Sequence, residues 1–185
     1  MPKYAFFDLE TTGLDPQTCK ILEIGAIAAA DDAGIESVAI FQRAVHFIRG
    51  TLPISPNVQK MHANNGLWLA CEQTDPHCTI DYLDKAFVDW LKQNGYERGK
   101  TILCGHSIHF DRSFIQVHMP VTYEYLSHRM VDTGAMSRLL REFGIDLPKE
   151  ESSSHRAMAD AWMARRELRA IYSLAKEYAE LKRGG

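Results

Sequence analysis

The chain has 185 residues, 45% of them hydrophobic, and a formal net charge of −3 at pH 7. This length suits one globular domain with a substantial core, so we expect a single domain over residues 1–185. The charge lacks the basic excess that holds long nucleic-acid backbones, so a nucleic-acid substrate would be held locally. No window approaches the roughly 18 apolar residues of a membrane span, and the first four residues lead into a strand rather than a signal peptide. We therefore expect a cytoplasmic protein with no membrane partner.

The beginning of the chain indicates three consecutive strands. They are expected over residues 4–8, 21–30 and 36–47, with the turn Asp31-Asp32-Ala33-Gly34 before the third. Consecutive strands joined by short turns predict an antiparallel meander.

Helical periodicity dominates the remainder. Helices are expected at 57–64, 80–93, 109–118 and 133–143, with short strands at 101–104 and 130–131. A long C-terminal helix is predicted by apolar residues that recur every three or four positions, at Ala161, Ala164, Leu168, Ile171, Ala175 and Tyr178. This order predicts an α/β domain with a mixed sheet and helices on its faces.

The first predicted strand runs into FFDLETTG (6–13), which places two acids in an apolar segment. Residues two apart on a strand point to the same side, so Asp8 and Glu10 form a pair of oxygen ligands. The alternative is a buried, hydrogen-bonded Asp8 with Glu10 exposed where the strand ends.

Two more acids lie at predicted helix starts. Asp111 follows the strand that ends at Gly105, where an acid can also simply complement the helix dipole. Asp160 lies four residues before Ala164 and eight before Leu168, so it borders the apolar stripe of the last helix. A carboxylate in that position needs a cation or a strong hydrogen-bond network.

His155 lies five residues before Asp160, after a candidate N-cap run at 152–154. Five residues turn a helix by about 140° beyond a full turn, so His155 would face away from Asp160 if both were helical. We therefore expect it at the helix mouth or in the preceding loop, where it could act as a general base.

Four acids, two of them on one strand, and a histidine near the last acid fit a phosphodiesterase site with two cations. Ligation by oxygen alone favours Mg²⁺ or Mn²⁺ over zinc.

Three motifs in order, FDLETTGLD (7–15), GHSIHFDR (105–112) and HRAMAD (155–160), resemble the DEDD-type 3′-to-5′ exonucleases in their His-containing branch. The resemblance covers almost the whole chain. It implies a ribonuclease-H-like fold with a five-stranded mixed sheet flanked by helices. It also implies a metal site of Asp8, Glu10, Asp111 and Asp160, with His155 as base, and release of nucleoside 5′-monophosphates.

Within this branch the sequence is most similar to oligoribonucleases, at MHANNGL (61–67), DRSFI (111–115) with Met119-Pro120, and HRMVD (128–132). These enzymes finish RNA decay on very short single strands, so the resemblance implies short RNA oligonucleotides as substrates. It also implies a homodimer.

The resemblance further implies that Ser107, His62 and Arg129 hold the terminal phosphate and that Leu14 wedges against a base. The alternatives are a surface ion pair for Arg129 and a core position for Leu14. Two positions depart from the family pattern: Asn57 stands where a tryptophan is usual, and His128 replaces a tyrosine that is contributed across the dimer interface. His128 could still donate to a phosphate.

Three rival interpretations remain. The nearest is a general exonuclease on longer single-stranded DNA or RNA, which the missing tryptophan favours and the charge opposes. A non-catalytic nucleotide-binding module would be marked by loss of an acid, and none is lost. The third is a zinc site, with candidate ligands at His62, Cys71, His77 and Cys78. Reduced thiols explain the four scattered cysteines more simply.

Overall fold

A computed structural model describes residues 3–29, 38–51, 54–147 and 155–184. The predicted turn at 31–34 and the N-cap run at 152–154 lie outside these ranges. The strands in the described residues are β1 (Lys3–Thr11), β2 (Ile21–Ala29), β3 (Val38–Ala44), β4 (Thr101–Gly105) and β5 (Met130–Asp132). They form one mixed sheet in the order β3-β2-β1-β4-β5, antiparallel from β3 to β1 and parallel from β1 to β5. The expected five-stranded mixed sheet is thus confirmed.

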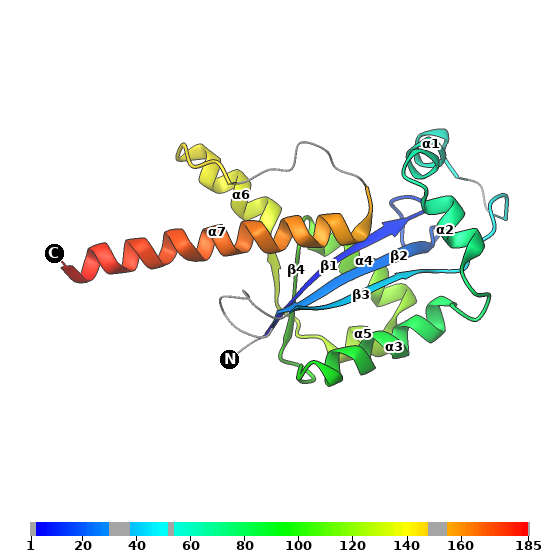
Figure 1. Ribbon diagram of the computed structural model, residues 1–185, viewed down its shortest axis with the longest axis horizontal. Coiled ribbons are helices and arrows are strands. Elements are labelled where there is room, and N and C mark those ends of the chain that lie inside the picture. Colours follow the sequence, from blue (N-terminus) through cyan, green and yellow to red (C-terminus); the bar gives the residue numbers. More distant parts are fainter. Residues whose placement is uncertain (1–2, 30–37, 52–53, 148–154, 185) are drawn as a thin grey trace.

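The helices cover both faces of the sheet (Figure 1). In chain order they are α1 (Pro56–Asn64), α2 (Leu67–Gln73), α3 (Ile80–Gln93), α4 (Ile108–His118), α5 (Pro120–Tyr125), α6 (Thr133–Glu142) and α7 (Ala157–Gly184). α7 crosses one face, and α3, α4 and α5 lie on the other. No helix of the described ranges has a stretch long and apolar enough to cross a bilayer.

Alternation along β1 divides the core into two layers. Phe7 packs in the larger cluster with Phe87 of α3 and Phe114 of α4, whereas its neighbour Phe6 packs in a second cluster with Ala161 of α7. Because strand side chains alternate, Asp8 and Glu10 point to the same side as Phe6, toward α7. The strand thereby fixes the direction of both acids.

The start of α7 packs very closely against β2. A Cβ atom added to Gly25 would lie 2.4 Å from the backbone carbon of Ala157 and 2.6 Å from the nitrogen of Met158. Only a residue without a side chain leaves room for this approach. Gly25 is also the register partner of Asp8 on β1, so the helix reaches the sheet beside the first acid.

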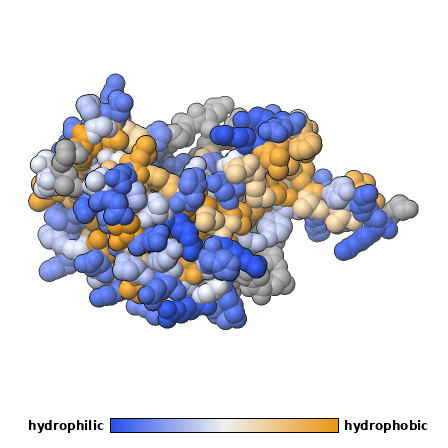
Figure 2. All heavy atoms as spheres, turned by 180° about the vertical axis from the view of Figure 1, so that it is seen from behind, coloured by the Kyte–Doolittle hydropathy of each residue, from blue (hydrophilic) through white to orange (hydrophobic). Residues whose placement is uncertain are grey.

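The C-terminal part of α7 extends beyond the sheet (Figure 1). The predicted stripe is buried from Ala161 to Leu168, but Ala175 and Tyr178 are exposed. Viewed from behind, hydrophobic atoms gather around α6 and the root of this projecting segment (Figure 2). The large hydrophobic residues exposed on α6 and α7 are Leu139, Tyr172, Tyr178 and Leu181.

The sequence predicted the long elements to within a few residues and missed two short helices. α2 has seven residues and α5 has six, which is too short for a helical period to stand out. β1 continues three residues past its expected end at Asp8, so Glu10 lies within the strand rather than at its exit.

Candidate active site

Three acids from β1 and α7 meet at one point. Asp8, Glu10 and Asp160 each offer a carboxylate oxygen, and these oxygens lie within 4.8 Å of one another. Asp160 lies in the first turn of α7, which is the turn that packs against Gly25. The alternative in which Glu10 is exposed where the strand ends is wrong, because Glu10 is only 7% exposed and its carboxylate lies beside those of Asp8 and Asp160.

Asp111 joins the group from the other side of the sheet. It is 3% exposed in the first turn of α4, and its Oδ1 accepts a 2.9 Å hydrogen bond from the backbone nitrogen of Leu9. Repulsion from Asp111 is the largest effect of any neighbouring charge on Asp8. All four predicted acids are therefore close neighbours.

Three of the four carboxyl groups, those of Asp8, Glu10 and Asp111, strongly favour their protonated forms when no cation is present. Burial, and then repulsion from Asp111 and Asp160, raises the pKa of Asp8 well above its usual range. Burial, followed by repulsion from Asp160, raises the pKa of Glu10 to about 8. Burial raises the pKa of Asp111 to about 8 despite its hydrogen bond from Leu9. Such clustered acids are stable as anions only beside positive charge.

The donor set fits a hard divalent cation. All of the converging ligand atoms are carboxylate oxygens, with no thiol or imidazole among them, and this is the ligand set that Mg²⁺ and Mn²⁺ prefer. Among the described residues the zinc candidates His62, Cys71, His77 and Cys78 do not form such a group. The zinc interpretation is therefore wrong, and the four cysteines are free.

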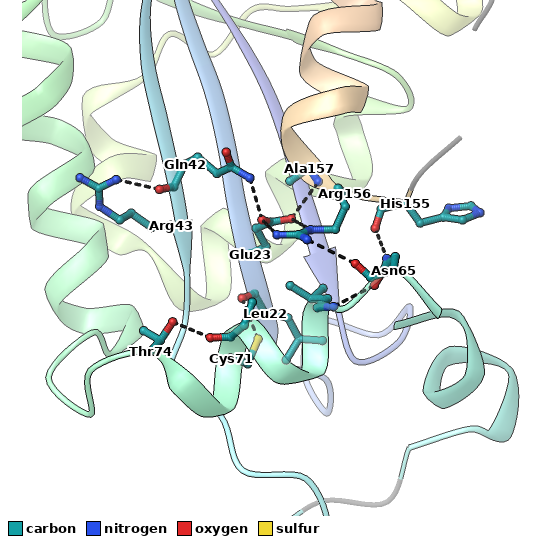
Figure 3. Close-up of polar contacts among 12 residues, drawn as sticks. Leu22, Glu23, Gln42, Arg43, Asn65, Cys71, Thr74, His155, Arg156 and Ala157 are labelled. Atoms are coloured by element: carbon teal, nitrogen blue, oxygen red, sulfur yellow. Dashed lines mark hydrogen bonds and ion pairs between the residues drawn. The ribbon is translucent and has the colours of Figure 1, made fainter. Parts of the chain in front are cut away.

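His155 lies two residues before α7, as the sequence predicted. It is exposed and has a positive φ of 45°, so the chain turns sharply before the helix begins. Its carbonyl accepts a hydrogen bond from Asn65, and its ring extends away from that contact (Figure 3). The loop position places the histidine at the mouth of the helix that carries Asp160.

Two of the predicted substrate contacts lie in loops at the carboxyl ends of β1 and β4. Leu14 is 82% exposed between β1 and β2, so the alternative of a core position is wrong. Ser107 is exposed and has a positive φ of 48°, and its backbone nitrogen donates to Oδ1 of Asp132. Both residues are accessible to a ligand.

The other three substrate candidates differ in exposure. Arg129 and His128 are exposed just before β5, and Arg129 forms no ion pair with a described residue. His62 is fully buried, with Nε2 3.0 Å from the Thr11 carbonyl and its ring edge-on to Trp68. The His62 ring is not accessible to a ligand in this structure. Its contact with a phosphate therefore stays a prediction.

Sequence reasoning missed an ion pair beside the site. Glu23 of β2 and Arg156 form a two-pronged salt bridge at 2.7 and 3.0 Å. Glu23 is the register partner of Glu10 on the adjacent strand. The segment ILEIGAI (21–27) could have indicated this pair, because an acid within an apolar strand needs a cationic or hydrogen-bonding partner. A second missed pair joins His106 to the buried Glu167 of α7.

The chain is similar to known exonucleases over most of its length. The family model described as Exonuclease (RNase_T) matches residues 5–168. An oligoribonuclease from Rhodococcus jostii is 31% identical over 176 residues, covering 90% of this chain and 84% of that protein. A probable oligoribonuclease from Drosophila melanogaster is 28% identical over 166 residues, covering 88% of this chain and 77% of that protein.

Solved structures agree on the fold. E. coli exonuclease I, in a zinc-bound complex with single-stranded DNA, matches with a TM-score of 0.60 at 18% identity. The match covers 96% of this chain and 41% of that one, so the present chain spans about two fifths of the length of exonuclease I. The same enzyme in complex with a dA13 oligonucleotide gives a TM-score of 0.56.

Proposed function

Because the chain belongs to the Exonuclease family and is similar to oligoribonucleases over most of its length, we propose that it is a metal-dependent 3′-to-5′ exonuclease. Its substrates are short single-stranded oligoribonucleotides, and its products are nucleoside 5′-monophosphates. The observation that carries this proposal is the convergence of carboxylates from β1 and α7, with Asp111 of α4 beside them. We also assign residues 1–185 to one exonuclease domain.

Asp8, Glu10, Asp111 and Asp160 hold two divalent cations, Mg²⁺ or Mn²⁺, around the terminal phosphodiester. Bound there, the cations would lower the pKa of the attacking water and stabilise charge on the departing 3′ oxygen. The raised carboxyl pKa values support this assignment, because such groups gain most when a cation replaces their protons.

His155 accepts the proton of the attacking water. Its exposed position just before the helix that carries Asp160 supports this role. A general base must offer a ring nitrogen without a proton, and imidazole can do so.

Loop residues hold the substrate. Leu14 presents an apolar surface to a base without selecting its identity, and Ser107 donates to the terminal phosphate. Arg129 offers a planar donor fork to the same phosphate, and His128 adds a second donor from the adjacent position. We also propose that the protein forms a homodimer, in which His128 and Arg129 would lie near the interface. Light scattering of the purified protein would measure the mass of the assembly and so test this.

The test is a time course with Mn²⁺ on 5′-labelled RNA and DNA of two to about twenty nucleotides. We expect dinucleotides to disappear far faster than long strands, RNA to be preferred, and EDTA or Asp8→Asn to abolish hydrolysis. An Asp8→Asn variant that retains near-normal activity would overturn the assignment of the metal site.

One observation favours a second candidate, a general exonuclease on longer single strands. Asn57 is exposed on α1 at the position where related enzymes usually have a tryptophan, so one side of the base-binding wedge is open. Degradation of twenty-nucleotide strands at least as fast as dinucleotides would favour this candidate.

A further inference from the structure

Asn65 connects the turn between α1 and α2 to the backbone around His155. Its side-chain nitrogen donates to the His155 carbonyl, and its own carbonyl accepts a 3.3 Å hydrogen bond from Nη1 of Arg156 (Figure 3). Its side-chain oxygen accepts a 3.0 Å bond from the backbone nitrogen of Leu67. Two groups of Asn65 therefore join segments that are 90 and 91 positions apart in the chain, and the third fixes the side chain within its own turn.

Glu23 holds the other side of the same backbone. Its carboxylate, with a side chain 1% exposed, binds Arg156 in two places and accepts a 3.0 Å bond from the backbone nitrogen of Ala157. Gln42 of β3 donates a further 3.1 Å bond to it. Residues 155, 156 and 157 are thus each fixed by a named partner on β2 or in the α1–α2 turn.

The backbone at His155 needs such support. A residue with a side chain seldom adopts a positive φ, because its Cβ atom is then crowded against the following carbonyl oxygen. The direction of the imidazole is set by this turn, because the Cα–Cβ bond leaves the backbone at residue 155. A change in φ there would redirect the ring.

We propose that Asn65, together with the Glu23–Arg156 pair, is a positioning residue that acts through His155 and holds the imidazole in its productive direction. The proposal rests on the function proposed above. Asn65 is not one of the acids of the cluster. Its effect on the reaction is exerted through the carbonyl of His155.

The decisive variant is Asn65→Asp. The new carboxylate still accepts from Leu67 but cannot donate to the His155 carbonyl, and it repels that carbonyl. We expect kcat on a short RNA to decrease by roughly 10- to 100-fold, as expected for a misplaced catalytic group, with little change in KM. The Mn²⁺ dissociation constant from calorimetry and the melting temperature should stay close to those of the wild-type protein.

The matched control is Asn64→Asp. Asn64 is the exposed last residue of α1, has the same chemistry, and introduces the same charge one position away. We expect it to leave kcat near the wild-type value. Equal losses in the two variants would show a general effect of charge and would overturn the proposal.

A double-mutant cycle distinguishes positioning from a purely structural role. In a His155→Ala background, Asn65→Asp should cause no further loss of kcat, because the group through which it acts is absent. A full additional loss in that background would overturn the proposal, as would wild-type kcat in the Asn65→Asp single variant. These results are distinguishable from failure of the proposed function, in which the wild-type protein itself would not hydrolyse RNA.

Glu23→Gln is a second test of whether this network positions His155. Its control is Glu72→Gln, which breaks the exposed, two-pronged Arg49–Glu72 pair. Glu23→Gln should lower kcat, and the loss should again vanish in the His155→Ala background. If Glu23→Gln does not fold, the Asn65 cycle alone decides.

Discussion

The backbone nitrogen of Leu9 donates a 2.9 Å hydrogen bond to Oδ1 of Asp111, although the two residues are 102 positions apart. This bond joins the start of α4 to the middle of the sheet. It brings the third acid beside Asp8 and leaves the second oxygen of Asp111 for another partner. One carboxylate thus serves both the fold and the site.

Asp111→Asn should separate these two roles. The amide oxygen can still accept from Leu9, and removal of a crowded charge relieves repulsion, so the metal-free melting temperature should stay equal or rise. Hydrolysis should decrease by about 100-fold or more, because a charged ligand is lost. Melting curves with and without Mn²⁺ and steady-state assays measure both effects.

Asp84→Asn is the control for that experiment. Asp84 is also buried and accepts 2.9 and 2.7 Å bonds from the backbone nitrogens of Val121 and Thr122 at the start of α5, away from the acid cluster. The amide can satisfy only one of them, so unfolding should become easier by about 1–3 kcal/mol while Mn²⁺ binding is retained. The opposite pattern in the two variants would contradict the assignment of structural and ligand roles.

Stability without metal should fall as pH rises. The pKa of Glu10 and that of Asp111 are both raised to about 8 by burial and by neighbouring carboxylates, whereas in the unfolded chain each is about 4. Their stabilising contribution is therefore fully present below about pH 4 and is lost as pH rises through about 8. In EDTA, the melting temperature should decline between pH 5.5 and 8.5, and saturating Mn²⁺ should reverse the decline.

Asp111→Asn should flatten this pH dependence. His106 contributes with the same sign, because its hydrogen bond to Glu167 raises the pKa of the imidazole and this contribution is also lost at higher pH. Glu167→Gln therefore measures the part that comes from His106. A melting temperature that rises with pH in EDTA would show that the acids are not crowded in solution.

Gly25→Ala should damage both stability and turnover. The added methyl group would lie 2.4 Å from the backbone of Ala157, so α7 must move away from β2 and carry Asp160 with it. We expect a loss of about 1–3 kcal/mol in the free energy of unfolding and a weaker affinity for Mn²⁺. Chemical denaturation and calorimetry test this, and a variant with wild-type values would contradict the close approach.

Leu14→Ala should affect binding alone. The side chain is 82% exposed, so the free energy of unfolding should change by less than about 0.5 kcal/mol. Loss of one base contact, worth about 1–3 kcal/mol, should raise KM for a dinucleotide by about 5- to 150-fold. Leu181→Ala is the control, because Leu181 is 77% exposed at the far end of α7. A similar change in both variants would remove Leu14 from the substrate site.

Local periodicity explains why the acids could be predicted from sequence. The two-residue repeat of β1 put Asp8 and Glu10 on one side, and the helical phase of Ala164 and Leu168 placed Asp160 beside the buried stripe. The same phase argument required His155 to lie outside the helix, as it does. These inferences needed only the geometry of a single element.

The missed features depend on contacts between distant segments. Glu23 and Arg156 are separated by 133 positions, and each alone looks like an ordinary charged residue. The burial of His62 likewise follows from the packing of α1 against Thr11 and Trp68, which no local pattern encodes. Resemblance to a family suggested a phosphate contact for this histidine but carried no information about its depth.

The order of the strands has a consequence for protein synthesis. β1 is made first, but its parallel neighbour β4 begins at Thr101 and α7 begins at Ala157. At a translation rate of about 5–20 residues per second, roughly 8 to 30 seconds pass between the synthesis of Glu10 and that of Asp160. The acid cluster is therefore incomplete until the first turn of α7 has been made. Under the proposed metal site, the growing polypeptide would become able to cleave RNA only after Asp160 has been added.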